Sequence, residues 1–369
     1  MTKPTNPPRD ALIIGAGISG LLTARELAAA GLRVTVLEKG RLGGESSWAG
    51  GGILSPLCPW RAPEPISALC RWSQQQYPRL ASHLLDETGI DPEWTRSGLL
   101  VSCGQDFARA LEWCRREQAE CVPVTSAHLR ELEPHLHPLG ANVLLLPAIA
   151  QIRNPRLLRA LRAAVEQEGI TVLEAHEVTD IVADGDSVQA VVTPYGRHSA
   201  DCFVLAAGAW SSRVLADLLP GLTIEPVKGQ MLAFGADPGL LSHIVLSDDR
   251  YLIPRRDGVI LAGSTVEYTE FDKTTTDSAR AQIEDFARSA LPDLAIVPVL
   301  KHWAGLRPGS PTGIPYIGRH PDLRNLFVNC GHFRNGFVMA PASARLLADL
   351  VLGRPPLVPP EPYAPTSPH

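Results

Sequence analysis

Residues 11–22 read Ala11-Leu-Ile-Ile-Gly15-Ala-Gly17-Ile18-Ser19-Gly20-Leu-Leu22, and residues 34–38 read Val34-Thr-Val-Leu-Glu38, with a helical pattern between them that Gly31 ends. The first apolar run predicts a strand, the glycines predict a tight turn, and the second apolar run predicts a strand that ends at Glu38, eighteen residues after Gly20. This complete strand, turn, helix, strand and acid unit predicts a nucleotide-binding α/β fold.

Each residue of this unit has a chemical role. Gly15 makes the tight turn, Gly17 lets the backbone approach a pyrophosphate, and Gly20 allows close packing of the helix on the strand. The N-terminus of the helix faces the anion, and Glu38 can accept both hydroxyl protons of an adenosine ribose. We expect a dinucleotide site, with a glycine-rich structural turn as the alternative. The motif leaves open whether the dinucleotide is NAD or FAD.

The bulk composition restricts the classes of partner. The chain has 369 residues, which predicts two domains, and 45% of them are hydrophobic and 20% charged. A net charge of −5 without long runs of one sign argues against a surface for nucleic acid or an anionic membrane. Residues 1–10 are polar and proline-rich, so they do not resemble a signal peptide or an anchor.

The cysteine and histidine patterns predict neither disulfides nor a metal site. The seven cysteines are odd in number and include no Cys-x-x-Cys pair, and the eleven histidines form no His-x-x-x-His pattern. We interpret the cysteines as reduced thiols of a cytoplasmic protein.

The segment after Glu38 is rich in glycine and serine. Such a stretch can wrap closely around a flat ligand and donate backbone N–H groups to it. The alternative is a flexible surface loop, but the large apolar side chains of Trp48, Ile53 and Leu54 favour a packed one.

The middle of the chain alternates predicted helices and strands. Helices are expected over 66–88, where Pro78 should kink or split the segment, over 107–120, and over 154–168 with Asn154 as N-cap. Strands are expected at 98–102 and at 170–174, which echoes residues 31–38 and should join the same sheet. A hairpin over 177–193 follows.

Small residues follow two further apolar strands. The predicted strand 201–207 ends at Gly208, and the strand 326–329 leads into a glycine-rich turn before a helix over 340–352. A cofactor lying over the carboxyl ends of a sheet requires such small residues. The tail after Gly353 is expected to be extended or loose.

These patterns predict an α/β plus α+β fold. A discontinuous, Rossmann-like nucleotide-binding domain is expected over residues 1–65, 148–222 and 301–369. The antiparallel pattern of residues 223–300, with 66–147, predicts a substrate-binding domain built on an antiparallel or mixed sheet.

Several phrases together resemble a known family. They are Gly15-x-Gly17-x-x-Gly20 with Glu38, Leu205-Ala-Ala-Gly208-Ala-Trp-Ser211, Pro226-Val-Lys-Gly-Gln230, Trp303-Ala-Gly-Leu-Arg307-Pro-Gly309 and Gly331-His-Phe-Arg334-Asn-Gly336. From Leu12 to Leu352 the chain resembles the D-amino-acid-oxidase family of FAD-dependent amine oxidases, and most of all its glycine-oxidising members of thiamine thiazole biosynthesis. The resemblance implies an FAD-binding domain and often a homotetramer.

The resemblance also implies that the FAD is noncovalent. In the sarcosine-oxidase branch the flavin is attached through a cysteine, and the stretch Arg307–Gly318 contains none.

The resemblance assigns roles to single residues. Arg307 is expected to bind the carboxylate of the substrate, since its planar fork meets both oxygens. Tyr251 is expected near the same carboxylate, and Arg334 beside the flavin. The alternatives are a surface salt bridge for either arginine and a core position for Tyr251.

The resemblance places further residues around the FAD. Those expected in contact with it, beside the glycine motif, are Ile18, Ser19, Lys39, Ser46, Ser47, Gly51, Gly52, Ile53, Val178, Gly208, His332, Phe333, Asn335, Gly336, Phe337 and Val338. Two positions depart from the family: Asp249 and Val266 stand where members can carry histidine and methionine, a difference that bears on the finer shape of the pocket.

The implied reaction is the oxidative deamination of glycine, and also of sarcosine and small D-amino acids, with transfer of hydride from the α-carbon to FAD and reduction of O2 to H2O2. The imine then hydrolyses to glyoxylate or passes to a thiazole synthase partner. The alternatives are a D-amino-acid dehydrogenase or another amine oxidase of the same fold, the FAD module of a tRNA-modifying enzyme, and an NAD-dependent dehydrogenase.

Overall fold

A six-stranded sheet forms one half of the molecule. The computed structural model describes residues 8–366, so most of the polar segment 1–10 lies outside the described residues. The strand order is β16 (Tyr316–Arg319), β17 (Leu326–Cys330), β10 (Cys202–Leu205), β1 (Asp10–Ile14), β2 (Arg33–Leu37) and β6 (Thr171–Leu173). All neighbours are parallel except β16 with β17. The prediction that residues 170–174 join this sheet is confirmed.

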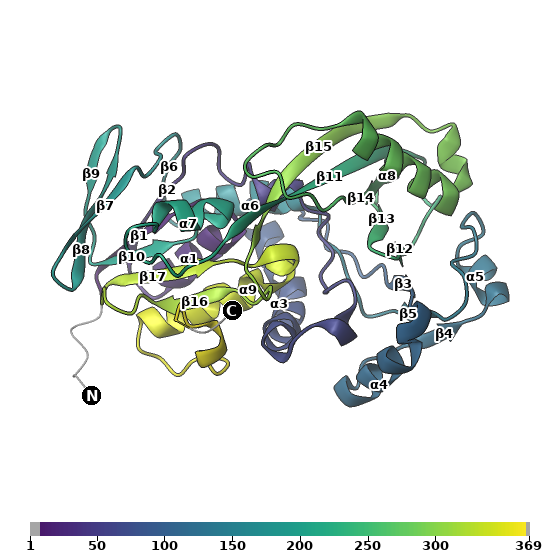
Figure 1. Cartoon of the computed structure of the whole chain (residues 1–369), viewed down its shortest axis with the longest axis horizontal. Helices are drawn as coiled ribbons and strands as arrows, with labels where there is room; N and C mark the ends of the chain where they lie inside the picture. The colour runs from purple at the N-terminus through teal and green to yellow at the C-terminus, as the bar shows by residue number, and fades with distance from the viewer. Residues whose placement is uncertain (1–7, 367–369) are drawn as a thin grey trace.

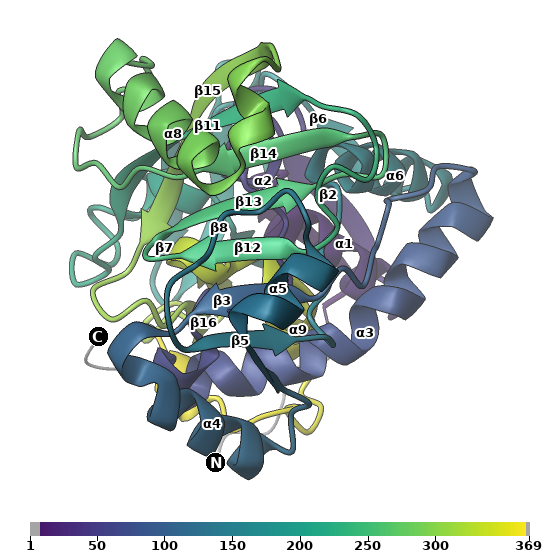
Figure 2. The same cartoon turned by 90° about the vertical axis from the view of Figure 1, so that its right-hand side faces the viewer.

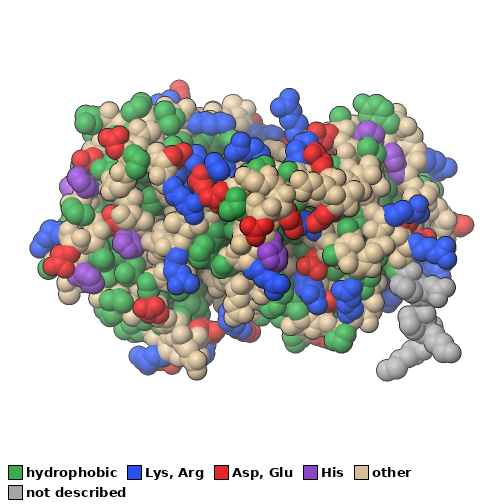
Figure 3. Space-filling view, turned by 180° about the vertical axis from the view of Figure 1, so that it is seen from behind, with side chains coloured by type: hydrophobic (Ala, Val, Ile, Leu, Met, Phe, Trp, Pro, Cys, Tyr) green, Lys and Arg blue, Asp and Glu red, His purple; other side chains and the backbone are tan. Residues whose placement is uncertain are grey.

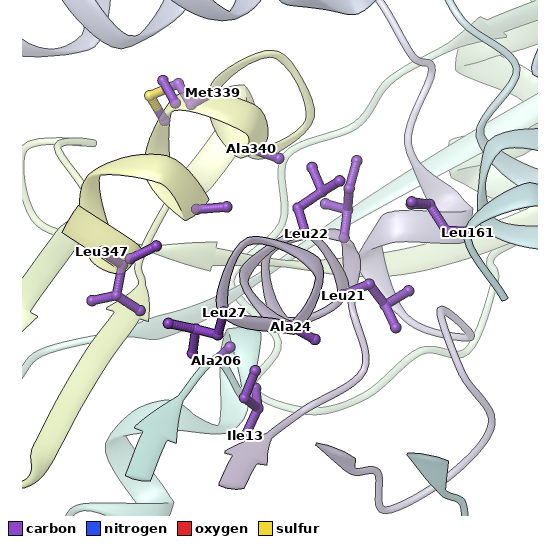
Figure 4. Close-up of a cluster of buried hydrophobic side chains, with 14 of the residues drawn as sticks. Ile13, Leu21, Leu22, Ala24, Leu27, Leu161, Ala206, Met339, Ala340 and Leu347 are labelled. Carbon is purple, nitrogen blue, oxygen red and sulfur yellow. The ribbon is translucent and has the colours of Figure 1, made fainter. Parts of the chain in front are cut away.

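Both faces of this sheet are covered, which explains why its strands are almost continuously apolar. Ala11 and Ile13 pack with the helices α1 (Ile18–Ala29), α3 (Glu64–Thr88), α6 (Asn154–Gln167) and α9 (Gly336–Val351). Leu12 and Ile14 point to the other face, toward the small sheet of β7 (Asp180–Asp184), β8 (Ser187–Thr193) and β9 (Gly196–His198). Figure 4 shows Ile13 below α1, with Leu347 and Ala340 reaching α1 from α9.

An eight-stranded sheet forms the other half (Figure 1). Figure 2 shows most of its strands in succession. Their order is β15 (Val299–Gly309), β11 (Glu225–Gly235), β14 (Val259–Gly263), β13 (Arg250–Pro254), β12 (Ile244–Ser247), β3 (Leu99–Ser102), β5 (Val143–Leu146) and β4 (Val122–Val124).

The neighbours in this second sheet are antiparallel except β12 with β3. The helix α8 (Asp277–Ala290) packs on one face and α4 (Phe107–Glu117) on the other. The predicted fold class, with one Rossmann-like and one mixed-sheet half, is confirmed.

Asn154 is not the expected helix cap, and the structure excludes one of the two alternatives expected at Pro78 and in the tail after Gly353. Pro78 does not split the predicted helix, because Tyr77, Ala81 and Leu84 on its apolar side are buried in the core, and this packing outweighs one lost backbone hydrogen bond. Asn154 is the first residue of α6 rather than its cap, and its side-chain amide donates to the Ser47 carbonyl oxygen at 2.9 Å.

The proline-rich tail is not loose along its described length. Tyr363, in the short helix Glu361–Tyr363, is 1% exposed, and its hydroxyl donates to the carbonyl oxygen of Pro65 at 2.7 Å.

Two further observations concern the surface and membranes. Positive and negative side chains are interspersed over the face shown in Figure 3, in keeping with the small net charge of −5. Among residues 8–366, the helices are too short or too polar to cross a bilayer.

Candidate active site

A cavity of about 470 Å³ lies between the two sheets. The carboxyl ends of β1, β2, β10 and β17 line one part of it, and β11, β13 and β15 line the other. Of the residues predicted for the cofactor and substrate, all line this cavity except Gly20 and Val338. Val338 is 1% exposed and lies within the helical core, whereas a Cβ atom at Gly20 would come within 1.9 Å of the Gly15 carbonyl oxygen.

The glycine turn has the conformation that its sequence demands. Gly15 has a φ of +109°, and a Cβ atom there would lie 2.4 Å from the Ala206 carbonyl oxygen, so only glycine fits. Gly17 has an extended backbone, and its missing Cβ would meet nothing closer than the Ser47 hydroxyl at 3.2 Å. The turn therefore leaves room at Gly17, in front of the N-terminus of α1, where an anion is favoured.

Glu38 stands at the nucleotide end of the cavity and is 7% exposed. Its two carboxylate oxygens accept hydrogen bonds from the backbone amides of Ala16 and Gly40, both at 2.8 Å. These bonds hold the carboxylate in one orientation, and each oxygen keeps a second lone pair that can accept a hydroxyl proton.

The glycine- and serine-rich segment is tightly packed. Its short helix α2 (Ser46–Ala49) ends at a turn in which Gly52 has a φ of +73°. A Cβ atom at Gly52 would come within 2.1 Å of the Ile152 carbonyl oxygen, and one at Gly51 within 2.6 Å of the Ile253 side chain. This segment thus adjoins both the nucleotide turn and strand β13.

Arg255 stabilises the turn at Gly51 and Gly52, a role that the sequence does not reveal. Its guanidinium donates to the carbonyl oxygens of Gly51 at 2.7 Å and Ile152 at 3.2 Å, and to the Gln151 side chain at 2.5 Å. Burial lowers the pKa of Arg255 to about 10, so the side chain stays charged at neutral pH. No local pattern marks this role, because every contact is distant in sequence.

Arg307 lies at the opposite end of the cavity, on β15. Its guanidinium donates to the Ser264 hydroxyl at 2.6 Å and to the Thr265 carbonyl oxygen at 3.2 Å. Within residues 8–366 no carboxylate lies within ion-pair distance of it, so its charge faces the cavity without a counter-ion. Burial lowers the pKa of Arg307, but a guanidinium remains charged at neutral pH.

Tyr251 borders the same end of the cavity and is 7% exposed. Its hydroxyl interacts with Arg307, whose pKa this hydrogen bond raises against the larger effect of burial, and it also contacts the Met231 sulfur at 3.7 Å. Gly263 pairs with both Met231 and Tyr251, and a Cβ atom there would crowd both side chains at 3.0 and 3.4 Å. Gly263 is a second residue that the sequence reasoning missed.

Arg334 reaches the cavity from the turn before α9. Its guanidinium lies 3.7 Å from the carboxylate of Asp249, whose side chain is 77% exposed. Asp249 and Val266, the two departures from the family pattern, are both exposed, and neither lines the cavity. An exposed pair of this length contributes little to stability.

His332 lies beside this turn and is 3% exposed. Burial lowers the pKa of His332 to about 4, so the ring is neutral at pH 7. One ring nitrogen lies 3.1 Å from the Ser343 hydroxyl. The wall formed by residues 332–337 thus combines a neutral imidazole with the positively polarised N-terminus of α9.

The residues that line the cavity suit the binding of FAD. The residues that line it include Glu38, the glycine turn, the 332–337 turn and Arg307. Asn329, which also lines the cavity, is 1% exposed and its side-chain oxygen has no hydrogen-bond partner in the described part of the chain. Among these residues no three His, Cys, Asp or Glu side chains are grouped to bind a metal ion.

Comparisons with known proteins agree with this geometry. A sequence model of the FAD dependent oxidoreductase (DAO) family matches residues 10–350. The glycine oxidase of Pseudomonas aeruginosa is 49% identical over 96% of this chain and 98% of its own length. The bifunctional protein ThiO/ThiG of Synechocystis is 32% identical over 93% of this chain, which covers 51% of that protein. The crystal structure of glycine oxidase from Geobacillus kaustophilus has a TM-score of 0.91 and 30% identity, over 97% of this chain and 98% of that one.

Proposed function

The chain belongs to the FAD dependent oxidoreductase family, and from this premise we propose that it is a glycine oxidase. It oxidises glycine to the imine with reduction of O2 to H2O2, and water then hydrolyses the imine to glyoxylate and ammonia. Sarcosine and small D-amino acids are weaker substrates. The main support for this proposal is the guanidinium of Arg307, which lines the cavity without a carboxylate partner in the described part of the chain. A planar guanidinium in such a position can bind both oxygens of a substrate carboxylate.

Arg307 and Tyr251 position the substrate. Two donors from the guanidinium and one from the Tyr251 hydroxyl hold the carboxylate at more than one point, which fixes the orientation of the bonds at Cα. The contribution of these residues is binding and orientation rather than acid–base catalysis. The side chains of Tyr251 and Met231 pack against Gly51 and Gly263, where these glycines have no side chains. A pocket narrowed in this way favours a small substrate such as glycine.

FAD, when bound, supplies the two-electron acceptor that this oxidation needs and the means of passing the electrons to O2. The residues that would hold it without a covalent bond are those of the glycine turn, Glu38, the Ser46–Ile53 segment and the 332–337 turn.

No side-chain base is required at the substrate end. His332 is a poor proton acceptor, because burial lowers its pKa to about 4. Within the described part of the chain, no Asp or Glu lines the cavity beside Tyr251 and Arg307. The ammonium group of the substrate can instead lose its proton to solvent before oxidation.

Three further properties belong to the proposal: the pathway, the cellular location and the oligomeric state. The imine can also pass to a thiazole synthase partner, which gives the protein a role in thiamine biosynthesis. Relatives that carry the name ThiO/ThiG support this assignment. Seven free thiols, five of them buried, support a reducing, cytoplasmic location. The family resemblance supports a homotetramer, which light scattering of the purified protein can test.

The domain assignment belongs to the same proposal. Residues 1–65, 148–222 and 301–369 would bind FAD, and residues 66–147 and 223–300 would shape the substrate pocket. Strand β15 crosses the boundary at residue 300 and brings Arg307 from the second sheet to the cofactor cavity.

A substrate panel with peroxide detection tests the function. The purified, flavin-loaded protein is given glycine, sarcosine, D-alanine or D-proline, and H2O2 and glyoxylate are measured. We expect peroxide with glycine, and Arg307→Ala is expected to lose most of this activity while retaining flavin. Strong turnover of D-alanine with an artificial quinone acceptor, and none of glycine with O2, would instead identify a D-amino-acid dehydrogenase.

A further inference from the structure

Residues 264–267 form an arm along one edge of β11. The backbone amide of Lys228 donates to the Glu267 carbonyl oxygen at 2.8 Å, and that of Glu267 donates back to Lys228 at 2.9 Å. Strand β15, which carries Arg307, lies along the other edge of β11. The Arg307 side chain therefore crosses β11 to reach Ser264 and Thr265, and it crosses at Gly229, which has no side chain to block it.

The carboxylate of Glu267 ties this arm to β11. It accepts hydrogen bonds from the Thr265 hydroxyl and from the Gln230 side-chain amide, the latter at 2.9 Å. It also lies 3.2 Å from the ammonium group of Lys228. Burial acts to raise the pKa of Glu267, but the hydrogen bonds from Thr265, Gln230 and Lys228 outweigh it and lower the pKa.

Lys228 is an unusual residue at this position because it is only 1% exposed. Besides Glu267, its ammonium group contacts the Asp272 carboxylate and the Thr274 carbonyl oxygen, both at 3.2 Å. A buried ion pair is seldom retained for stability alone, since apolar residues of similar size often serve as well.

Thr265 joins these ionic groups to Arg307. Its carbonyl oxygen accepts from the Arg307 guanidinium while its hydroxyl donates to Glu267. Glu267 is also a carboxylate whose charge acts on Arg307. If that negative charge were not balanced, it would compete with the substrate carboxylate for the guanidinium.

We propose that Lys228, Glu267 and Thr265 form a positioning network that holds the Arg307 guanidinium in place and balances the nearby carboxylate, so that the charge of Arg307 is free for an anionic substrate. None of the three touches the substrate in this scheme. The inference rests on the proposed role of Arg307 in binding the substrate carboxylate.

The test measures binding rather than turnover. Acetate has the carboxylate of glycine without the amine, and its dissociation constant is read from the change in flavin absorbance of the loaded protein. Lys228→Met leaves the Glu267 charge unbalanced, and we expect it to weaken acetate binding about tenfold, or about 1.4 kcal/mol. Adding Glu267→Gln to Lys228→Met is expected to restore most of the affinity, and KM for glycine should rise more than kcat falls in Lys228→Met.

Glu133 is a matched control. This carboxylate is 2% exposed, accepts hydrogen bonds from the backbone amides of Ser242 and His243 just before β12, and does not line the cavity. Glu133→Gln removes a charge of the same kind, and we expect acetate affinity to stay within twofold of wild type. Thr265→Val gives a second, milder break of the network should Lys228→Met fail to fold, and it should weaken acetate binding several-fold.

The outcomes separate the two proposals. Acetate affinity within twofold of wild type in folded, flavin-loaded Lys228→Met, or in Thr265→Val, overturns the network, as does a double variant no better than Lys228→Met alone. Unchanged acetate affinity in Arg307→Met would instead overturn the carboxylate role of Arg307 itself.

Discussion

The Arg307 guanidinium lies directly against the backbone of Gly229. A Cβ atom at residue 229 would stand 2.2 Å from Nη1, 2.4 Å from Nη2 and 2.5 Å from Cζ of Arg307. The two residues lie on neighbouring strands, β11 and β15. The Arg307 guanidinium can cross β11 at residue 229 only because glycine has no side chain there.

Gly229→Ala tests this need for glycine. One added methyl group forces the guanidinium away from Ser264 and Thr265, so we expect a fall in kcat/KM for glycine of about a hundredfold or more, with flavin content unchanged. Steady-state kinetics and the visible spectrum measure both quantities. Near-normal kinetics would mean that Arg307 can bind its ligand from another position.

Gly17→Val and Gly20→Ala are expected to fail in different ways. At Gly17 the backbone φ of −74° suits any residue and the nearest atom is the movable Ser47 hydroxyl, so the variant should fold but lack flavin. At Gly20 a Cβ atom would come within 1.9 Å of the Gly15 carbonyl oxygen, so the apoprotein itself should lose about 1–3 kcal/mol of stability. Flavin absorbance and urea unfolding distinguish the two, and Gly17→Val protein that retains FAD contradicts the placement of the pyrophosphate.

Tyr251→Phe isolates the contribution of one hydroxyl group. The ring still packs beside Gly51, Gly263 and Met231, so the melting temperature should change little. Loss of a donor near a charged ligand should raise KM for glycine about tenfold. A KM equal to that of wild type, with the same flavin content, would assign Tyr251 a packing role alone.

We expect the buried ring of His332 to make the free energy of unfolding depend on pH below 6.5. Burial lowers the pKa of His332 from 6.5 to about 4, so between these values the unfolded chain binds a proton that the folded chain does not. The stability contributed by the neutral ring is therefore full above pH 6.5 and is lost as the pH falls toward 4, by up to about 3 kcal/mol. Urea unfolding of the apoprotein from pH 4 to 7 measures this loss, and His332→Asn should show a smaller one; equal slopes would show that His332 is protonated in the fold.

The parts of the fold that sequence predicts best are those with local causes. The glycine turn, the strand ending at Glu38 and the small residues around Gly208 follow from short-range sterics, and all lie where the pattern requires. The roles of Gly229, Gly263 and Arg255 depend on contacts between distant segments, which no periodicity reveals. Pro78 shows the same limit, because the packing around α3 decides its outcome. The contacts proposed for Arg307, Tyr251 and Arg334 with substrate and flavin stay predictions.

Anaerobic mixing of the flavin-loaded protein with glycine is a direct test of the proposed oxidation. The visible flavin absorbance reports electron transfer from the substrate without any contribution from O2. We expect excess glycine to bleach the flavin of the wild-type protein but not that of Arg307→Ala at the same concentration. Methylamine, which lacks the carboxylate, should bleach neither. Wild-type flavin that stays oxidised in excess glycine would contradict the assignment of this protein as a glycine oxidase.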